Sequence, residues 1–186
     1  MIDLTKIVLP DTVEVEGRFY KIKTDFRQWL VFEKLLHQKS TYEDFNFIYE
    51  NEIPDNLQKG FEELIKFFNP QKVLPNDIGE SFGEKILDYE IDADFIYAAF
   101  FEQYKIDLLE TKNGKIIPMH WYKFQALLSG LHDTKLDQII SYRCYAPNDK
   151  DDYKKSMMKL KKMWQLPTEI SEQTQKDLDA FNALFE

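Results

Sequence analysis

The sequence of 186 residues has a single cysteine, only three histidines and no long apolar run. Cys144 alone cannot form an intramolecular disulfide, which argues against a disulfide-stabilised secreted protein. The longest apolar stretches, such as residues 95–101, are far shorter than the roughly 20 residues of a membrane-spanning helix. The N-terminus lacks the basic and apolar regions of a signal peptide. We therefore expect a cytoplasmic protein that does not cross a membrane.

Sequence motifs of enzymes are also missing. The chain has no glycine-rich phosphate-binding loop, no GxSxG motif and no metal-binding spacing around His37, His120 or His132. Cys144 could act as a nucleophile with His120 or His132, but a free cysteine is more often a small buried apolar residue. We therefore expect no catalytic residue, no metal site and no cofactor.

Positive charge is scarce outside one segment. The net charge is −9, and residues 41–110 contain 17 Asp and Glu against 5 Lys and Arg. Residues 150–162, in contrast, contain six lysines against two aspartates. Most of such a surface repels phosphate backbones. We therefore do not expect nucleic acid to be the main partner.

Apolar and aromatic residues are abundant, at 44% and 15% of the chain, which is enough for a core in one domain of this size. Residues 12–23 alternate apolar and polar side chains around Glu16-Gly17, a pattern typical of a β-hairpin whose glycine takes a positive φ. Apolar side chains at helical spacing then predict a series of helices. These are expected from about 25 to 36, twice within 41–69, over 95–104, at 119–129, over 136–143 and at 150–165.

Capping residues indicate where these helices begin and end. Gly130 is expected to end the helix at 119–129 in a left-handed conformation. The expected N-caps are Thr24 or Asp25, Ser40 with Glu43 in a capping box, Asp92 or Asp94, Asp133 or Thr134, and Asp149 or Asp151.

These elements predict a mainly α fold class: a helical bundle-like domain preceded by a short N-terminal β-hairpin. Residues 1–167 form the expected single domain, with the hairpin at about 12–23 and the helix over 95–104 at its centre. Residues 69–83 include two prolines and two glycines and are expected to form a loop. Residues 168–186 are expected to form an amphipathic tail helix.

Three tryptophans, Trp29, Trp121 and Trp164, fall on predicted apolar faces and are expected in the core. Neighbouring residues on a helix point about 100° apart, so Trp121 and Tyr122 are not expected to be equally buried. Tyr122 is therefore a candidate for a partner-binding surface.

The lysine-rich segment 153–164 surrounds an apolar face that includes two adaptable side chains, Met157 and Met158. A solvated helix packed on its own core is the simpler interpretation. The alternative is that this face binds the acidic region 41–110 of another copy, which would give a homo-oligomer weakened by salt. Met157 and Met158 are therefore candidate partner-binding residues.

The C-terminal tail has a similar ambiguity. Apolar side chains recur there at helical spacing, and three of them, Phe181, Leu184 and Phe185, are candidate partner-binding residues. Docking of the tail on its own domain is the favoured interpretation, and docking in a partner's groove is the alternative.

Two aromatic-rich segments, at 87–110 and 120–131, are followed closely by DTKLDQIISYRC at 133–144. The chain also contains VEVEGRFYKIKTDFRQWLVFEKLL at 13–36 and YKKSMMKLKKMWQLP at 153–167. In their amino-acid sequences and in their order along the chain, these segments resemble those of the bacteriophage gene-product-fifteen family, from tailed phages of Gram-positive hosts. The resemblance implies a gene in the tail-assembly region, ahead of the gene for the tape-measure protein.

The resemblance further implies a non-enzymatic tail-assembly chaperone of the host-cell cytoplasm. Such a chaperone binds the tape-measure protein and keeps it soluble until the tail tube polymerises around it. A frameshift-extended form that contacts the tail-tube protein is also implied. One alternative is a minor structural protein retained in the virion at the tail or head-tail connector. Another, supported only by charge, is an acidic inhibitor that mimics DNA.

Overall fold

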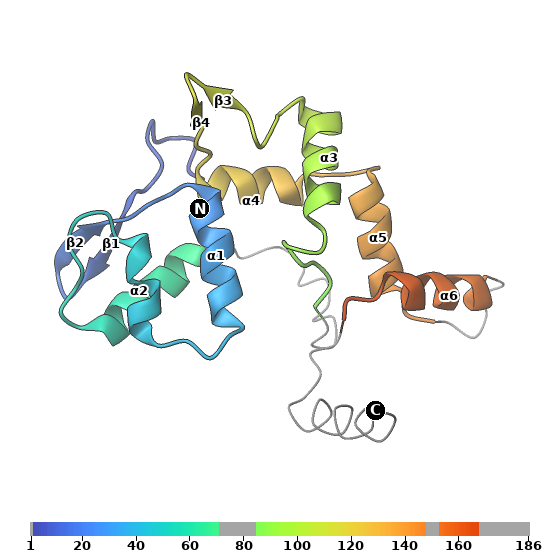
Figure 1. Cartoon of the computed structure of the whole chain (residues 1–186), viewed down its shortest axis with the longest axis horizontal. Helices are drawn as coiled ribbons and strands as arrows, with labels where there is room; N and C mark the ends of the chain where they lie inside the picture. Colours follow the sequence, from blue (N-terminus) through green and yellow to red (C-terminus); the bar gives the residue numbers. More distant parts are fainter. Residues whose placement is uncertain (1, 71–84, 148–152, 168–186) are drawn as a thin grey trace, which may run out of the picture.

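The computed structural model describes residues 2–70, 85–147 and 153–167, in which helices dominate (Figure 1). The expected mainly α fold class with a short N-terminal hairpin is confirmed. In chain order the elements are strands β1 (Thr12–Val15) and β2 (Arg18–Lys21), helix α1 (Phe26–Leu36), the 3₁₀ helix η1 (Tyr42–Ile48), helices α2 (Leu57–Phe68) and α3 (Ala93–Tyr104), strands β3 (Thr111–Lys112) and β4 (Lys115–Ile116), and helices α4 (Trp121–Ser129), α5 (Lys135–Cys144) and α6 (Lys154–Trp164).

The β1–β2 hairpin forms as its sequence predicts. Its turn residues Glu16 and Gly17 both have positive φ, of 52° and 79°, the conformation of a two-residue turn that matches the twist of the strands. Val13 pairs with Tyr20 across the antiparallel ladder, and both are buried. The apolar face of the hairpin lies on α2, because a two-stranded ribbon needs such packing to be stable.

Helices α1 and α4 are joined where they begin. The Trp121 N–H donates to the Thr24 carbonyl at 2.7 Å, and the Phe26 N–H donates to the Met119 carbonyl at 2.8 Å. The Asp25 carboxylate, which caps α1, also accepts from the Met119 N–H at 3.0 Å. These bonds fix the two N-termini to each other although nearly a hundred residues separate them.

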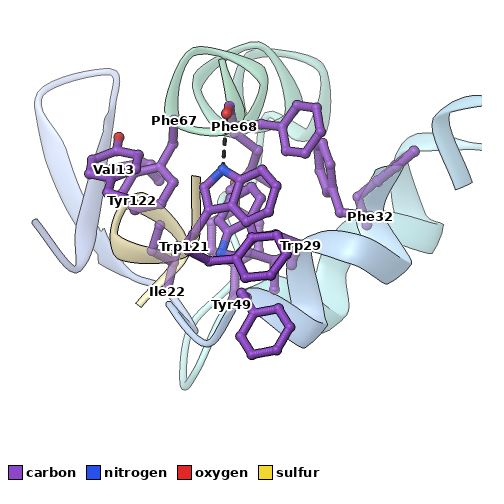
Figure 2. Close-up of a cluster of buried hydrophobic side chains, with 14 of the residues drawn as sticks. Val13, Ile22, Trp29, Phe32, Tyr49, Phe67, Phe68, Trp121 and Tyr122 are labelled. Carbon is purple, nitrogen blue, oxygen red and sulfur yellow. Dashed lines mark hydrogen bonds between the residues drawn. The ribbon is translucent and has the colours of Figure 1, made fainter. Parts of the chain in front are cut away.

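An aromatic core lies between α1, α2 and α4 (Figure 2). Trp29 and Trp121 have no exposed surface, and Trp121 stacks on Phe68 with ring centres 5.2 Å apart. Each indole N–H has a backbone acceptor: Trp121 donates to the Phe68 carbonyl at 2.9 Å and Trp29 to the Lys23 carbonyl at 3.0 Å. The core therefore buries both tryptophans with their indole N–H groups paired. We define the aromatic core as Trp29, Phe32, Phe67, Phe68, Trp121 and Phe124.

The two helices expected within 41–69 differ from the prediction in detail. The first is a 3₁₀ helix, in which the buried side chains Phe45 and Ile48 are three residues apart and so lie in one line. It is capped by Thr41 and Asp44 rather than by Ser40 and Glu43; the Asp44 carboxylate accepts from the Thr41 N–H at 2.7 Å. The second, α2, begins at Leu57 after the N-cap Asn56.

The expectation of a left-handed Gly130 is wrong. Gly130 has φ −92° and ψ −1° and ends α4 with an ordinary right-handed turn. Glycine is needed there for space, since a Cβ atom would lie 2.9 Å from the Tyr104 hydroxyl oxygen. That hydroxyl donates to the Leu127 carbonyl at 2.9 Å, which ties α3 to α4. The left-handed terminus belongs instead to Lys105, at the end of α3, with φ 57°.

Helix α3, which was expected at the centre of the domain, lies beside the aromatic core. Its Phe100 stacks on Phe124 with ring centres 5.3 Å apart, but the adjacent Phe101 is half exposed. The tryptophans at the centre come from α1 and α4 because the joined N-termini of these helices bring their apolar faces together.

Helices α5 and α6 form the other end of the molecule. Thr134 caps α5, as expected, by accepting from the Asp137 N–H. Helix α6 packs on α5, and in Figure 1 it lies at the opposite end from the β1–β2 hairpin and α2. The caps proposed for α6, Asp149 and Asp151, lie outside the described residues. So do the greater part of the expected loop at 69–83 and the tail helix at 168–186, and the single domain over 1–167 stays a prediction.

Candidate interaction surfaces

A buried arginine positions the C-terminal helices. Arg143 of α5 pairs with Asp92 at the start of α3 through two bonds, of 2.6 and 2.9 Å, and both side chains are buried. The same guanidinium donates to the Ile86 carbonyl at 3.0 Å and to the Trp164 carbonyl at 2.7 Å. Arg143 thus joins the segment before α3, the start of α3 and the end of α6. We call these four residues the Arg143 hub.

Sequence reasoning did not identify this hub. Asp92 was expected only as an N-cap, and its side chain makes no capping bond. The available signal was the position of Arg143, which follows Leu136 and Ile139 at helical spacing on the buried face of α5. An arginine on such a face needs a charged partner, because burying an unpaired charge is costly.

Helix α6 covers little of the core. None of its residues is fully buried. Trp164, expected in the core, is half-buried at the end of the helix, with the Phe95 ring 5.7 Å away and the Lys135 ammonium 5.1 Å from its ring centre. Of the two methionines proposed from sequence, Met157 is half-buried and Met158 is 44% exposed.

The expectation that Trp121 and Tyr122 differ in burial is wrong. Tyr122 is only 6% exposed, and its ring stacks on Phe67 at 4.7 Å while Trp121 stacks on Phe68. Two consecutive rings at the end of α2 therefore cover two neighbouring residues of α4 (Figure 2). Burial also raises the pKa of the Tyr122 hydroxyl to about 12, so that it stays neutral at physiological pH.

Tyr122 nevertheless contributes to a pocket of about 590 Å³ on the outer side of α4. The pocket is lined by Ile2, Asn69, Pro70, Tyr122, Gln125, Ala126, Ser129 and Gly130. Its volume falls in the range of pockets that take a small ligand or a few side chains. The partner-binding role proposed for Tyr122 remains a prediction, now located at the wall of this pocket.

The N-terminal segment that follows Ile2 exposes large apolar side chains. Leu4, Ile7 and Val8 are all mostly exposed. The segment is held at its end by His120, the N-cap of α4, whose Nε2 lies 2.9 Å from the Pro10 carbonyl oxygen. This N-terminal arm, residues 2–10, therefore lies next to the α4 pocket.

A family model described as bacteriophage Gp15 protein matches residues 6–166 of the chain. The chain belongs to this bacteriophage family. The match confirms the resemblance seen in the sequence and includes residues 6–10 of the N-terminal arm, the α4 pocket except for Ile2, and α6. No curated protein and no solved structure matches the chain.

The candidate residues of this phage protein do not form one site. Tyr122 lies on α4 and the two methionines on α6, and Figure 1 shows these helices well apart. The tail candidates Phe181, Leu184 and Phe185 lie outside the described residues and beyond the family match. The structure thus offers two separate surfaces, one at the α4 pocket with the N-terminal arm and one on α6.

Groups with catalytic chemistry are dispersed. His37 lies by Glu33, His120 caps α4, and His132 contacts Gln103 before α5. Within residues 2–70, 85–147 and 153–167, no three His, Cys, Asp or Glu side chains are grouped as metal ligands would be. Across the same ranges no helix is long and apolar enough to span a membrane.

Cys144 was expected to be buried, and that expectation is wrong, because it is exposed at the end of α5. Its neighbour Arg143 occupies the inward-facing position there, and neighbouring residues on a helix point about 100° apart.

Proposed function

We propose that this phage protein is a tail-assembly chaperone, which binds the tape-measure protein in the host cytoplasm and keeps it soluble before the tail tube forms. The observation that carries the proposal is the Gp15-family match over residues 6–166. The action is binding without catalysis, and it needs no cofactor. A frameshift-extended form that also binds the tail-tube protein belongs to the same proposal.

The surface chemistry supports this proposal. A long amphipathic client exposes apolar stripes, and large exposed apolar patches tend to aggregate unless a partner covers them. The N-terminal arm offers Leu4, Ile7 and Val8 for such contacts, beside a pocket that can accept client side chains. The net charge of −9 keeps the resulting complex soluble.

Co-expression with the tape-measure protein from the same phage tests the proposal. We expect the client to move from the insoluble to the soluble fraction, in a complex with several copies of the chaperone. The variant Leu4→Ser/Ile7→Ser/Val8→Ser should recover less client than the wild type. Failure of the wild-type protein to form any complex would contradict the proposal.

A matched control places the same kind of change elsewhere. Ile53, Ile91 and Ile116 are about half exposed and lie away from the arm in sequence. Their combined substitution by serine removes three aliphatic side chains of the same kind, with a smaller exposed area, and should leave client recovery unchanged. Equal losses for both triple variants would assign binding to general surface hydrophobicity rather than to the arm.

The second candidate is a minor structural protein of the phage tail or head-tail connector, which the family match favours equally. Mass spectrometry of purified virions separates the two, since a chaperone is absent from mature particles and a structural protein is present in fixed copy number.

A further inference from the structure

The outward side of α6 carries a stripe of lysines. Lys155, Lys159 and Lys162 are exposed, and none has a hydrogen bond or ion pair with another described residue. At 3.6 residues per turn these three side chains project from the same side of the helix. Met158, 44% exposed, and Met163, 62% exposed, lie on either side of the stripe. We call these five residues the lysine face.

A complementary surface exists on η1 and α2. Tyr42 is about half exposed, and its ring lies 5.4 Å from that of Phe61, which brings the start of η1 against α2. Glu43 follows Tyr42 in the sequence, and Glu62 follows Phe61. Both glutamates are exposed, and neither forms an ion pair with a described residue. The Asp44 carboxyl adds a further negative charge, since hydrogen bonds from Thr41 lower its pKa. We call Tyr42, Glu43, Asp44 and Glu62 the acidic face.

The fold keeps these two faces apart within one molecule. Figure 1 shows α2 and α6 at opposite ends of the longest axis. The Arg143 hub and the contacts of Trp164 hold α6 in this position. The lysine face of one molecule therefore cannot contact the acidic face of the same molecule.

We propose that the lysine face of one copy binds the acidic face of a second copy. Each face combines like charges with exposed apolar or aromatic side chains, and the charges of the two faces are opposite. Complementary charge of this kind sets orientation and partner choice. Nucleic acid is the poorer occupant for the lysine face, because the net charge of −9 repels a polyanion from the rest of the molecule.

The pairing joins different patches on the two copies. Exposed ion pairs are individually weak, so the association is salt-sensitive and depends on several charges together. At about 0.02 M salt the charges act over roughly 20 Å, and at about 1 M over roughly 3 Å. The weight-average mass should therefore exceed the monomer mass of 22.3 kDa at low salt and approach it at high salt.

Charge-swapped pairs of full-length variants test the proposal by light scattering after size-exclusion chromatography. Lys155→Glu/Lys162→Glu and Glu43→Lys/Glu62→Lys should each be monomeric at low salt, because each presents two faces of the same sign. Their equimolar mixture should recover the mass of the wild type, since the acidic α6 of one variant now faces the basic η1 and α2 of the other. Lys112→Glu/Lys115→Glu, on the exposed β3–β4 hairpin, is the matched control and should behave as the wild type.

The outcomes distinguish this proposal from the proposed function. A wild-type protein that is monomeric at every salt concentration overturns the self-association, even if it still solubilises the client. A mixture that stays monomeric overturns it as well. If Lys155→Glu/Lys162→Glu loses the client or a nucleic acid while the wild-type mass never exceeds the monomer, the lysine face binds that other partner instead. Self-association without client capture would leave this inference standing and reject the chaperone function.

Discussion

The region around the aromatic core and helix α6 are held in place in different ways. Around Trp29 and Trp121, three helices and a hairpin bury large rings completely, and both indole N–H groups are satisfied by backbone carbonyls. Helix α6 has no fully buried residue and is attached by the Arg143 hub and the edge of Trp164. The core region is held by apolar burial, whereas α6 is held mainly by directed polar bonds.

This difference separates stability from interaction. Burial of apolar surface stabilises a fold by about 25 cal/mol per Å² and needs side chains that point inward. Hydrogen bonds to one buried guanidinium can fix the position of a helix while most of its side chains stay outside. The phage protein thus keeps the lysine face of α6 available although the helix is firmly oriented.

The largest effect is expected from Trp121→Ala. The substitution removes a fully buried indole from the aromatic core and takes away one of the two side-chain donors to the Phe68 carbonyl, leaving only the Gln125 amide at 3.1 Å. Large-to-small changes at such positions cost roughly 3–5 kcal/mol. We expect the free energy of unfolding, measured with urea, to fall by about 4 kcal/mol. The half-exposed Phe101→Ala should cost less than about 1 kcal/mol, and similar losses for both would show that the core is not centred on Trp121.

Arg143→Met tests the polar attachment of α6. The variant leaves the Asp92 carboxylate buried without its cation, which costs about 3 kcal/mol. It also frees the Trp164 carbonyl, so α6 should loosen. We expect lower urea stability together with a red shift of the Trp164 emission, which is resolvable because the other two tryptophans are fully buried.

A double variant separates the charge from the attachment. Arg143→Met/Asp92→Leu has no unpaired buried charge and should recover part of the lost stability. The Trp164 emission should stay shifted, since the donor to its carbonyl is still missing. If emission returned to the wild-type value, the contacts of Phe95 and Lys135 with Trp164 would suffice to position α6.

Local features of this fold could be predicted from sequence, and contacts between distant segments could not. The Glu16-Gly17 hairpin depends on a few neighbouring residues and is confirmed. The same is true of two N-caps, each of which was expected at one of two adjacent residues and is found at the second, Asp25 and Thr134. The Asp92–Arg143 pair spans 51 residues, and no local pattern brings its partners together.

The depth of Tyr122 shows why burial on a helix is hard to predict. Periodicity assumes one buried face, and Trp121 and Tyr122 cannot both be central to it. In the structure α2 ends with two rings, Phe67 and Phe68, which cover both residues. The exposed Cys144 is the converse case, because its neighbour Arg143 takes the inward position at the end of the helix.

A smaller effect is expected from the titration of His120. Its Nδ1 accepts from the Tyr122 N–H at 3.0 Å, and its Nε2 donates to the Pro10 carbonyl, so the neutral ring has both partners. Burial lowers the pKa of this imidazole, an effect that Lys123 strengthens. The unfolded chain therefore binds the proton first as the pH falls, and folding stability decreases through the ordinary histidine range.

The variant His120→Asn isolates this contribution. Asparagine is a good N-cap and does not titrate. The midpoint of thermal unfolding should fall more for the wild type than for the variant between about pH 7.5 and about pH 5.5. The wild type and the variant share all other titrating groups. Equal decreases in the midpoint of thermal unfolding would therefore show that protonation of His120 is not linked to folding.

The smallest effect is expected from Cys144→Ser. The thiol is exposed at the end of α5. A substitution of this kind at an exposed position changes the free energy of unfolding by less than about 0.5 kcal/mol. In the wild-type protein the thiol should react with a maleimide as fast in buffer as in urea. A slow reaction in buffer that urea accelerates would mean that the C-terminal end of α5 is covered.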